Sequence, residues 1–260
     1  MSMRGQTIRM LSLLLGMILV LVFLGACNKA EKAEPVAETP EQNSPMGLIE
    51  AGKLIVGTSP DYPPYEFRLQ KENTNQIVGL DIAIAEAIAK ELKLELVIRD
   101  YYFSKLFPAL ENGEVDMVIA GLSPTESRKQ KMDFSEVYYK AVQNMVVRKD
   151  DHEMYSNFDN LRDKRVGTQQ GSIQADMVKQ LVRGAQFEEK NTVHELIEAL
   201  KGNELDAVMI EAPVAEALAY KDDGLAIVQI TTTDQVPGME MVDSAIAVRK
   251  GNQMLLDQIN

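Results

Sequence analysis

One pattern occurs twice in the chain, as LFPALENGEVDMVIAG at residues 106–121 and as LIEALKGNELDAVMIE at residues 196–211. The copies align without gaps and are identical at six of sixteen positions, and each runs from a helical segment through a turn into an apolar strand. A shorter repeat, VGT, occurs at 56–58 and at 166–168. Any helix–turn–strand unit resembles another to some degree, but the two repeats come in the same order in both halves. We therefore predict two lobes of similar construction.

The sequence around the first copy predicts alternating strands and helices. Short apolar runs at 53–57, 94–98 and 115–120 predict strands, and amphipathic stretches at 80–94 and 104–112 predict helices. Such alternation gives an α/β architecture with largely parallel sheets. Ligands of these sheets bind beyond the carboxyl ends of the strands, often in a cleft between domains. The expected site is therefore lined by residues 58–59, 120–121, 168–169 and 210–211.

The composition is that of an acidic globular protein. The 260 residues include 27 Lys and Arg against 39 Asp and Glu, a formal net charge of −12, and 45% are hydrophobic. This length suits one large domain or two smaller ones. The acidic balance argues against nucleic acid as a partner, because binding it calls for clustered basic residues. With one cysteine and two histidines, the chain forms no internal disulfide, and we predict neither a metal site nor a cofactor.

The first 26 residues have the pattern of a secretory signal peptide. Arg4 and Arg9 precede the uncharged stretch 10–26, which ends in small residues before Cys27. The alternative is an uncleaved transmembrane anchor, for which 17 residues is about the minimum. The sequence LGAC at 24–27 resembles a lipobox, which implies acylation of Cys27 as the mature N-terminus. Either reading places the body of the protein outside the cytoplasm, held to the cell membrane.

A tether is expected to follow Cys27. Residues 28–45 contain three prolines, four glutamates and only one large aliphatic side chain, Val36. Such a segment cannot bury enough apolar surface to fold. We predict that residues 27–47 are a lipidated, disordered tether and that the folded body begins at Leu48.

Three residues of the first lobe are candidates for ligand binding. Tyr62 lies in the rigid loop TSPDYPPY at 58–65, and its ring either stacks on a ligand or covers the sheet edge. Phe103 is open to the same two interpretations, ligand contact or core. Arg128 follows a plausible helix N-cap at Thr125. Its guanidinium suits a carboxylate, although Arg128 also stands in a basic run that includes Lys129.

The second lobe offers complementary groups. Gln169 ends a predicted strand, and Gly171 and Ser172 open a helix whose N–H groups favour an anion. Glu211 ends the second copy of the repeat, where it either meets a cation or caps the helix that begins near Ala212. A zwitterion with an α-carboxylate and an α-ammonium suits these groups together with Arg128.

The chain resembles the solute-binding proteins of polar amino-acid ABC importers over about residues 48–260. The motifs that carry this resemblance are GTSPDYPPYEF at 57–67, GLDIA at 79–83, GLSPTESR at 121–128, DFSEVYY at 133–139 and GTQQGS at 167–172. The resemblance implies a two-lobed periplasmic-binding-protein type II fold with two crossover segments, near 139–144 and 237–243. Lobe 1 would comprise residues 48–141 plus 243–260, and lobe 2 residues 142–242.

The resemblance also implies a role for the polar residues. Arg128 would hold the α-carboxylate of an amino acid, assisted by Ser123 and by Ser172 and Ile173 at the start of a helix. Glu211 would take the α-ammonium group, a position that is more often Asp in the family.

The remaining expected site residues surround the ligand side chain. By resemblance, Tyr62 and Phe103 would sandwich it, and Gly121 would offer a backbone carbonyl. The family's binders of basic amino acids often carry Asp where this chain has Ser59, so we expect Asp61, two residues on, to take its place for a distal cation.

We therefore expect a monomeric substrate-binding lipoprotein that delivers a free amino acid, polar and possibly basic, to an ABC permease. Two alternatives belong to other classes: a receptor lobe for a ligand sensor, and a dehydratase-type enzyme that uses Glu211 as an acid. His152 and His194 lie away from the strand ends, and no catalytic triad is apparent in the sequence.

Overall fold

A computed structural model of the chain describes residues 46–71, 74–155, 158–229 and 241–260. Its elements belong to one compact unit, Gln42–Asn260. The predicted signal peptide, Cys27 and residues 27–45 of the tether lie outside the described residues. Within those four described ranges, no helix has the length and apolar character needed to cross a membrane.

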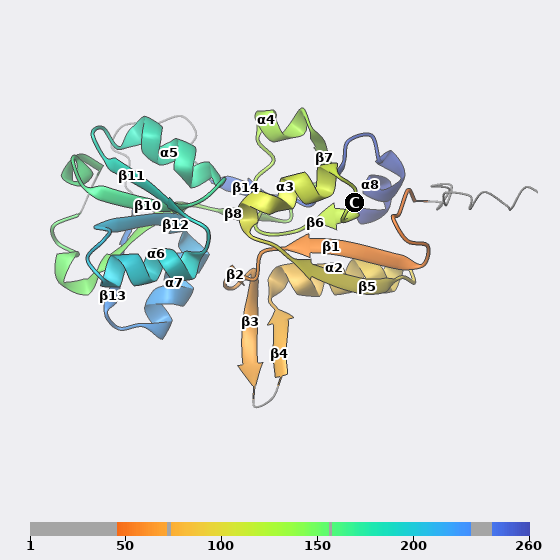
Figure 1. Cartoon of the computed structure of the whole chain (residues 1–260), viewed down its shortest axis with the longest axis horizontal. Coiled ribbons are helices and arrows are strands. Elements are labelled where there is room, and N and C mark those ends of the chain that lie inside the picture. Colours follow the sequence, from red (N-terminus) through yellow and green to blue (C-terminus); the bar gives the residue numbers. More distant parts are fainter. Residues whose placement is uncertain (1–45, 72–73, 156–157, 230–240) are drawn as a thin grey trace, which may run out of the picture. The chain divides into compact units, whose positions relative to one another are not determined.

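The first lobe is built on a five-stranded sheet (Figure 1). Its strand order is β5 (Glu95–Asp100), β1 (Lys53–Thr58), β6 (Met117–Val118), β15 (Ala247–Arg249), β7 (Met132–Phe134). Its helices are α2 (Leu80–Glu91), α3 (Phe103–Glu111), α4 (Glu126–Lys129) and α8 (Gln253–Ile259). Alternate residues of β1 point to opposite faces, so Leu54 and Val56 pack in one core cluster and Ile55 in another.

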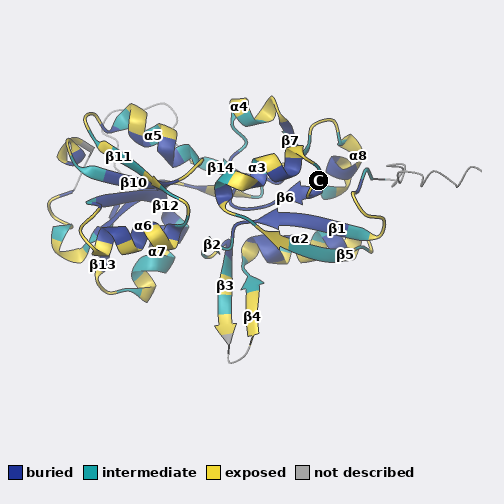
Figure 2. Cartoon of the chain, viewed as in Figure 1, coloured by how far each residue is buried: buried dark blue, intermediate teal, exposed yellow. Residues whose placement is uncertain are grey.

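The second lobe repeats this plan. Its strand order is β11 (Gln186–Lys190), β10 (Arg165–Gln169), β12 (Ala207–Glu211), β9 (Gln143–Arg148), β13 (Leu225–Gln229). Its helices are α5 (Ile173–Leu181), α6 (Val193–Lys201) and α7 (Ala212–Lys221), with two 3₁₀ turns, Lys149–Asp151 and Phe158–Leu161. Two hydrophobic clusters again fill the two faces of the sheet. Figure 2 shows the central strands of both sheets as mainly buried, the edge strands β5 and β11 as partly exposed, and the outer faces of the helices as exposed.

The α/β fold class is as predicted, and both sheets are largely parallel, but in each of them one strand, β15 or β9, runs against the other four described strands. Strand β1 runs parallel to β5 and β6, whereas β15 runs antiparallel to β6 and β7. In the second sheet, β9 is antiparallel to β12 and β13. The reason lies in the crossovers β8 (Tyr139–Ala141) and β14 (Val242–Ser244), which pair antiparallel. Strands β9 and β15 each follow a crossover from the other lobe. The crossover enters the sheet at the carboxyl ends of the parallel strands, so the strand that follows it runs antiparallel to them.

The repeated sequence has a repeated contact. In the first lobe, Asp116 donates its N–H to the Ile55 carbonyl (2.7 Å) and accepts the Ile55 N–H at Oδ2 (2.9 Å). In the second, Asp206 makes the same pair of bonds with Arg165, at 2.8 and 2.9 Å. Each aspartate thus ties the start of its own strand to the neighbouring parallel strand.

A three-stranded antiparallel sheet interrupts the first lobe after β1 and was not expected from the sequence. Its strands are β2 (Asp61–Tyr62), β3 (Glu66–Lys71) and β4 (Thr74–Val78). The register sets Tyr62 opposite Glu66. This sheet therefore places Glu66, whose side chain is 1% exposed, next to the loop that carries the tyrosines.

Candidate functional site

A narrow cavity of about 20 Å³ lies where the strand ends of both lobes meet. All ten candidate residues from the sequence line it, together with four others. The lining residues are Ser59, Asp61, Tyr62, Glu66, Phe103, Ala120, Gly121, Ser123, Arg128, Gln169, Ser172, Ile173, Gln174 and Glu211.

Arg128 is held in place by backbone carbonyls and aromatic rings. Its Nη1 donates to the Ser123 carbonyl (2.9 Å) and its Nη2 to the Gly171 carbonyl (3.0 Å), which belongs to the second lobe. The guanidinium carbon lies 4.6 Å from the ring centroid of Phe107 and 5.7 Å from that of Phe103. Burial lowers the pKa of Arg128 to about 10, so the side chain stays charged at neutral pH. It forms no ion pair with any residue that the structure describes, which leaves its charge available to an anion.

Ser123, Ser172 and Ile173 lie on the same side of the cavity as Arg128. Ser172 occupies the N-cap position of α5, and Ile173 is the first residue of that helix. The Ser172 hydroxyl does not cap the helix, and in the described part of the chain it has no hydrogen-bond partner, although it is buried. Polar groups of this kind at a helix N-terminus beside a guanidinium favour an anionic group of a ligand.

Glu211 is the N-cap residue of α7, but its carboxylate makes no capping bond. The side chain is 1% exposed, and Oε2 has no hydrogen-bond partner among the residues described. Burial raises the pKa of Glu211 to about 7, an effect that the Tyr65 hydroxyl partly offsets and the Asp81 carboxylate increases. The alternative in which Glu211 serves as a helix cap therefore fails, and the group instead faces the cavity.

Gly121 turns the chain beneath Tyr62. Its φ of +52° is a left-handed conformation that favours glycine, and an added Cβ would lie 3.3 Å from the Tyr62 ring. Its N–H donates to Oδ2 of buried Asp81 (2.8 Å), which in turn accepts the Tyr138 hydroxyl at 3.0 Å. Asp81 thus fixes the backbone at Gly121, three residues after β6 ends, although Asp81 itself does not line the cavity.

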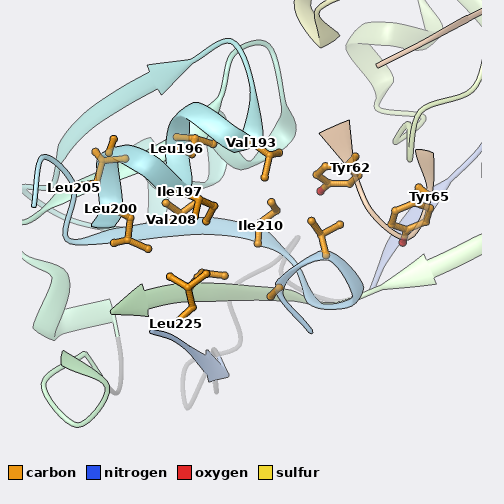
Figure 3. Packing of buried hydrophobic residues seen from close by; sticks show 14 residues of the cluster. Tyr62, Tyr65, Val193, Leu196, Ile197, Leu200, Leu205, Val208, Ile210 and Leu225 are labelled. Atoms are coloured by element: carbon orange, nitrogen blue, oxygen red, sulfur yellow. The ribbon is translucent and has the colours of Figure 1, made fainter. Parts of the chain in front are cut away.

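Tyr62 and Phe103 each line the cavity and also belong to a core cluster. The Tyr62 ring stacks on Tyr65 at 5.7 Å and packs with residues of the second lobe, among them Val193 and Ile210 (Figure 3). Phe103 packs edge-on against Phe107 in the first lobe. The two interpretations offered for these rings are therefore compatible, since each ring covers core on one side and cavity on the other.

Asp61 connects the lobes. Its Oδ2 accepts the Val193 N–H at the start of α6 (2.8 Å) and Nε2 of Gln169 (3.1 Å), and its Oδ1 accepts the Ser59 hydroxyl (3.2 Å). Burial raises the pKa of Asp61, and these donors lower it. Because donors of the protein already occupy both oxygens, Asp61 is less free for a distal cation than the sequence suggested.

Glu66 and Gln174 were missed by the sequence reasoning. Gln174 donates from Nε2 to Oε1 of Gln143 (2.8 Å), a buried pair in the second lobe. Both carboxylate oxygens of Glu66 are buried and have no hydrogen-bond partner among the described residues. The motif containing Glu66 gave no indication of this position, because the chain reaches the cavity only through the unforeseen turn between β2 and β3.

Two similar α/β lobes that meet at a cavity with one guanidinium and several carboxylates define a two-lobed binding protein. Residues 54–260 match the family described as bacterial extracellular solute-binding proteins, family 3. The chain belongs to this family, and both the resemblance and the type II fold predicted from the motifs are confirmed.

Several named proteins and solved structures are similar to this chain. The chain is 40% identical over 210 residues to the arginine-binding extracellular protein ArtP of Bacillus subtilis (strain 168), an alignment that covers 80% of this chain and 78% of that protein. It is 30% identical to a probable histidine-binding protein of Campylobacter jejuni, with coverage of 78% and 74%. The structure of the amino acid ABC transporter substrate-binding protein AbpA from Streptococcus pneumoniae, bound to L-arginine, superposes with a TM-score of 0.74 at 34% identity, covering 80% and 87%.

Proposed function

We propose that this chain is the substrate-binding lipoprotein of an ABC importer and that its ligand is a free cationic amino acid, with arginine preferred. The observation that carries the proposal is the charge of the cavity lining, in which Asp61, Glu66 and Glu211 face a single cation, Arg128. Arginine brings one negative and two positive groups, so it offsets this imbalance, whereas a neutral side chain brings no second cation to the acidic groups of the lining. Names of similar proteins that bind arginine support the same ligand.

The α-carboxylate is assigned to Arg128. Ser123 and the N-terminus of α5, at Ser172 and Ile173, assist by donating hydrogen bonds. The unpaired charge of Arg128 and the unpartnered Ser172 hydroxyl support this assignment.

The two cationic groups of the ligand are assigned to the acidic side of the cavity. Glu211 takes the α-ammonium group, assisted by the Gly121 carbonyl. The side chain passes between Tyr62 and Phe103, and Glu66 receives the guanidinium. Gln169 and Asp61 close the cavity by bridging the two lobes, as their hydrogen bond suggests.

The chain acts by binding and delivery, without catalysis, and presents its ligand to a membrane permease as a monomer. Residues 1–26 are removed, Cys27 is acylated, and 27–47 form the tether. Lobe 1 comprises 48–141 plus 243–260, and lobe 2 comprises 142–242. These boundaries agree with the membership of the two five-stranded sheets.

Thermal melting tests the proposal. We would use the chain from residue 28 onward, which retains the compact unit Gln42–Asn260, and melt it with each of the twenty amino acids. A ligand at 1,000 times its Kd stabilises the folded state by about 4 kcal/mol, which corresponds to a rise on the order of 10 °C. We expect the largest rise with arginine and none in Arg128→Ala. The matched control Arg183→Ala, at an exposed position, keeps the rise. A cooperative melt unchanged by every amino acid would contradict the assignment.

A further inference from the structure

Glu66 and Asp81 form a buried acidic pair at the ligand cavity, close enough for each carboxyl group to act on the other. Glu66 comes from β3 and Asp81 from the first turn of α2, and their side chains are 1% and 0% exposed. Glu66 lines the cavity, and neither of its oxygens meets a hydrogen-bond donor in the described part of the chain. Asp81 accepts the Gly121 N–H and the Tyr138 hydroxyl. All four residues belong to the first lobe, so the pair does not depend on contact with the second lobe.

No cation of the described chain neutralises this pair. None of the Lys, Arg or His side chains that the structure describes forms an ion pair with either residue, and nearby Arg68 pairs with Asp100. In the same described residues, no group of three or more His, Cys, Asp or Glu side chains is arranged to hold a metal ion. Two adjacent buried carboxylates without a cation cannot both stay ionised, because the desolvated charges repel each other.

The other groups around Glu66 add negative charge or are neutral. Asp61 and Glu211 approach from β2 and β12, and Tyr65 and Tyr138 are un-ionised phenols. Burial, followed by Asp81, raises the pKa of Glu66 well above its usual range, and Asp61 and Glu211 raise it further. Burial also raises the pKa of Asp81, although the Gly121 N–H and Tyr138 act in the opposite direction. Arg128 makes its contacts on the anion-binding side of the cavity, at Ser123 and Gly171.

We propose that Glu66 and Asp81 share one proton in the ligand-free protein and that the side-chain cation of the ligand displaces this proton into solvent. The inference rests on the proposed function and deepens it, since it makes binding an exchange of a proton for a guanidinium. The O–H bond of the Glu66 carboxyl group breaks, the proton passes to buffer, and the carboxylate that remains pairs with the ligand.

The exchange determines the direction in which the affinity for arginine changes with pH. The free site holds its proton below the raised pKa of Glu66, and the bound site does not. Affinity for arginine therefore falls by about tenfold for each unit that the pH drops below that pKa, and it levels off above it. A neutral ligand of the same shape leaves the Glu66 proton in place, so its affinity lacks the part of the pH dependence that belongs to Glu66.

Isothermal titration calorimetry in buffers of different ionisation enthalpy counts the protons released. The chain from residue 28 onward is titrated with arginine and with citrulline, its neutral isostere, at several pH values between 6 and 8. We expect about one more proton released with arginine than with citrulline. In Glu66→Gln this difference is lost, and in the control Glu86→Gln, at an exposed position of α2, it is retained.

The outcomes separate the two proposals. Arginine binding with no more proton release than citrulline binding overturns the exchange but leaves the amino-acid assignment standing. Binding of neither ligand, nor of any other amino acid, overturns the proposed function and the exchange with it. If Glu66→Gln does not fold, the proton count and the pH dependence of the unmodified chain still decide the question.

Discussion

At the scale of single residues, two glycines show how closely the lobes repeat each other. Gly57 in β1 and Gly167 in β10 occupy the same place in the two VGT repeats. A Cβ at Gly57 would meet Val115 and Leu106 at 3.3 and 3.4 Å, and one at Gly167 would meet Leu205 and Leu196 at 2.4 and 2.8 Å. The neighbours in one lobe are the aligned partners of those in the other. In each lobe the helix of the repeat therefore packs against the strand that carries the glycine, β1 or β10, and leaves little room there for a side chain.

The difference in these distances gives a prediction. Gly167→Ala forces buried Leu196 and Leu205 to move, since contacts below 3.0 Å cannot persist, and it should lower the free energy of unfolding by about 1–3 kcal/mol. Gly57→Ala brings its Cβ to 3.3 Å from Val115, a tight contact that a small shift of the neighbouring side chain relieves, and it should cost less. Urea unfolding of both variants measures the difference. Equal costs would mean that the second lobe is not packed more tightly at this position.

Single residues also show where sequence reasoning reaches its limit. Arg128 and Glu211 could be found because they stand at or just after strand ends, and sheet topology brings strand ends together. Glu66 could not be found in this way. It sits in an apparently exposed hairpin, and only the pairing of Tyr62 with Glu66 turns its side chain toward the cavity. Such a contact depends on a turn whose geometry the residues themselves do not reveal.

At the scale of elements, each repeat is a helix and strand fastened by one aspartate, but the two aspartates differ in charge environment. The Arg165 guanidinium binds Asp206 through Nε and Nη2, at 3.1 and 2.7 Å, and this contact lowers the pKa of Asp206. Burial raises the pKa of Asp116, which outweighs its backbone donors and the more distant Arg249. The folded state therefore favours the ionised form of Asp206 in the second lobe and the protonated form of Asp116 in the first.

This contrast predicts opposite responses to acid. Asp206→Asn should lower the free energy of unfolding at pH 7 by about 1–3 kcal/mol, because charge-assisted hydrogen bonds are lost. The difference from the unmodified protein should shrink as the pH falls through the lowered pKa of Asp206, since the native carboxylate then protonates. For Asp116→Asn the difference should not shrink, because protonation below the raised pKa of Asp116 favours the folded state. Urea unfolding between pH 3 and 7 measures the stability difference for each variant. If the two differences changed with pH in the same way, the contrast between Asp206 and Asp116 would be contradicted.

The predicted helices of the first lobe could be anticipated, whereas the direction of the antiparallel strands could not. The expected helices at 80–94 and 104–112 correspond to α2 and α3, because amphipathic periodicity is a local property. The antiparallel strands β9 and β15 are apolar in the same way as the parallel ones. Their direction depends on the crossovers between lobes, which is a long-range feature that strand patterning does not carry.

At the scale of the whole molecule, hydrogen bonds between described residues connect the two lobes at several points. Asp61 accepts from Val193 and Gln169, Arg128 donates to the Gly171 carbonyl, and the Ser104 hydroxyl lies 3.3 Å from Oε1 of Gln170. Tyr62 and Tyr65 add an apolar contact with the second lobe. A ligand that binds both lobes adds to these contacts and shifts the population toward the closed state.

Asp61 offers a test of closure. Asp61→Asn weakens the contact with the N-terminus of α6, so the closed state becomes less populated and affinity should fall by about tenfold, roughly 1.4 kcal/mol. Because closure acts on every ligand, the loss should be the same for arginine and for citrulline, whereas loss of a guanidinium contact would affect arginine alone. Calorimetric titration of both ligands distinguishes the two, with Asp223→Asn, at an exposed position, as the control. A loss confined to arginine would contradict the closure role.

The position of β15 between β6 and β7 affects the order in which the two lobes can fold. The proposed export of the chain proceeds from the N-terminus, so every strand of the second sheet, through β13, emerges before residues 247–249. The first sheet at that stage lacks an interior strand, and β7 has no neighbour in the sheet. We therefore expect the second lobe to assemble first and the first lobe to be the one that a chaperone or protease encounters incomplete.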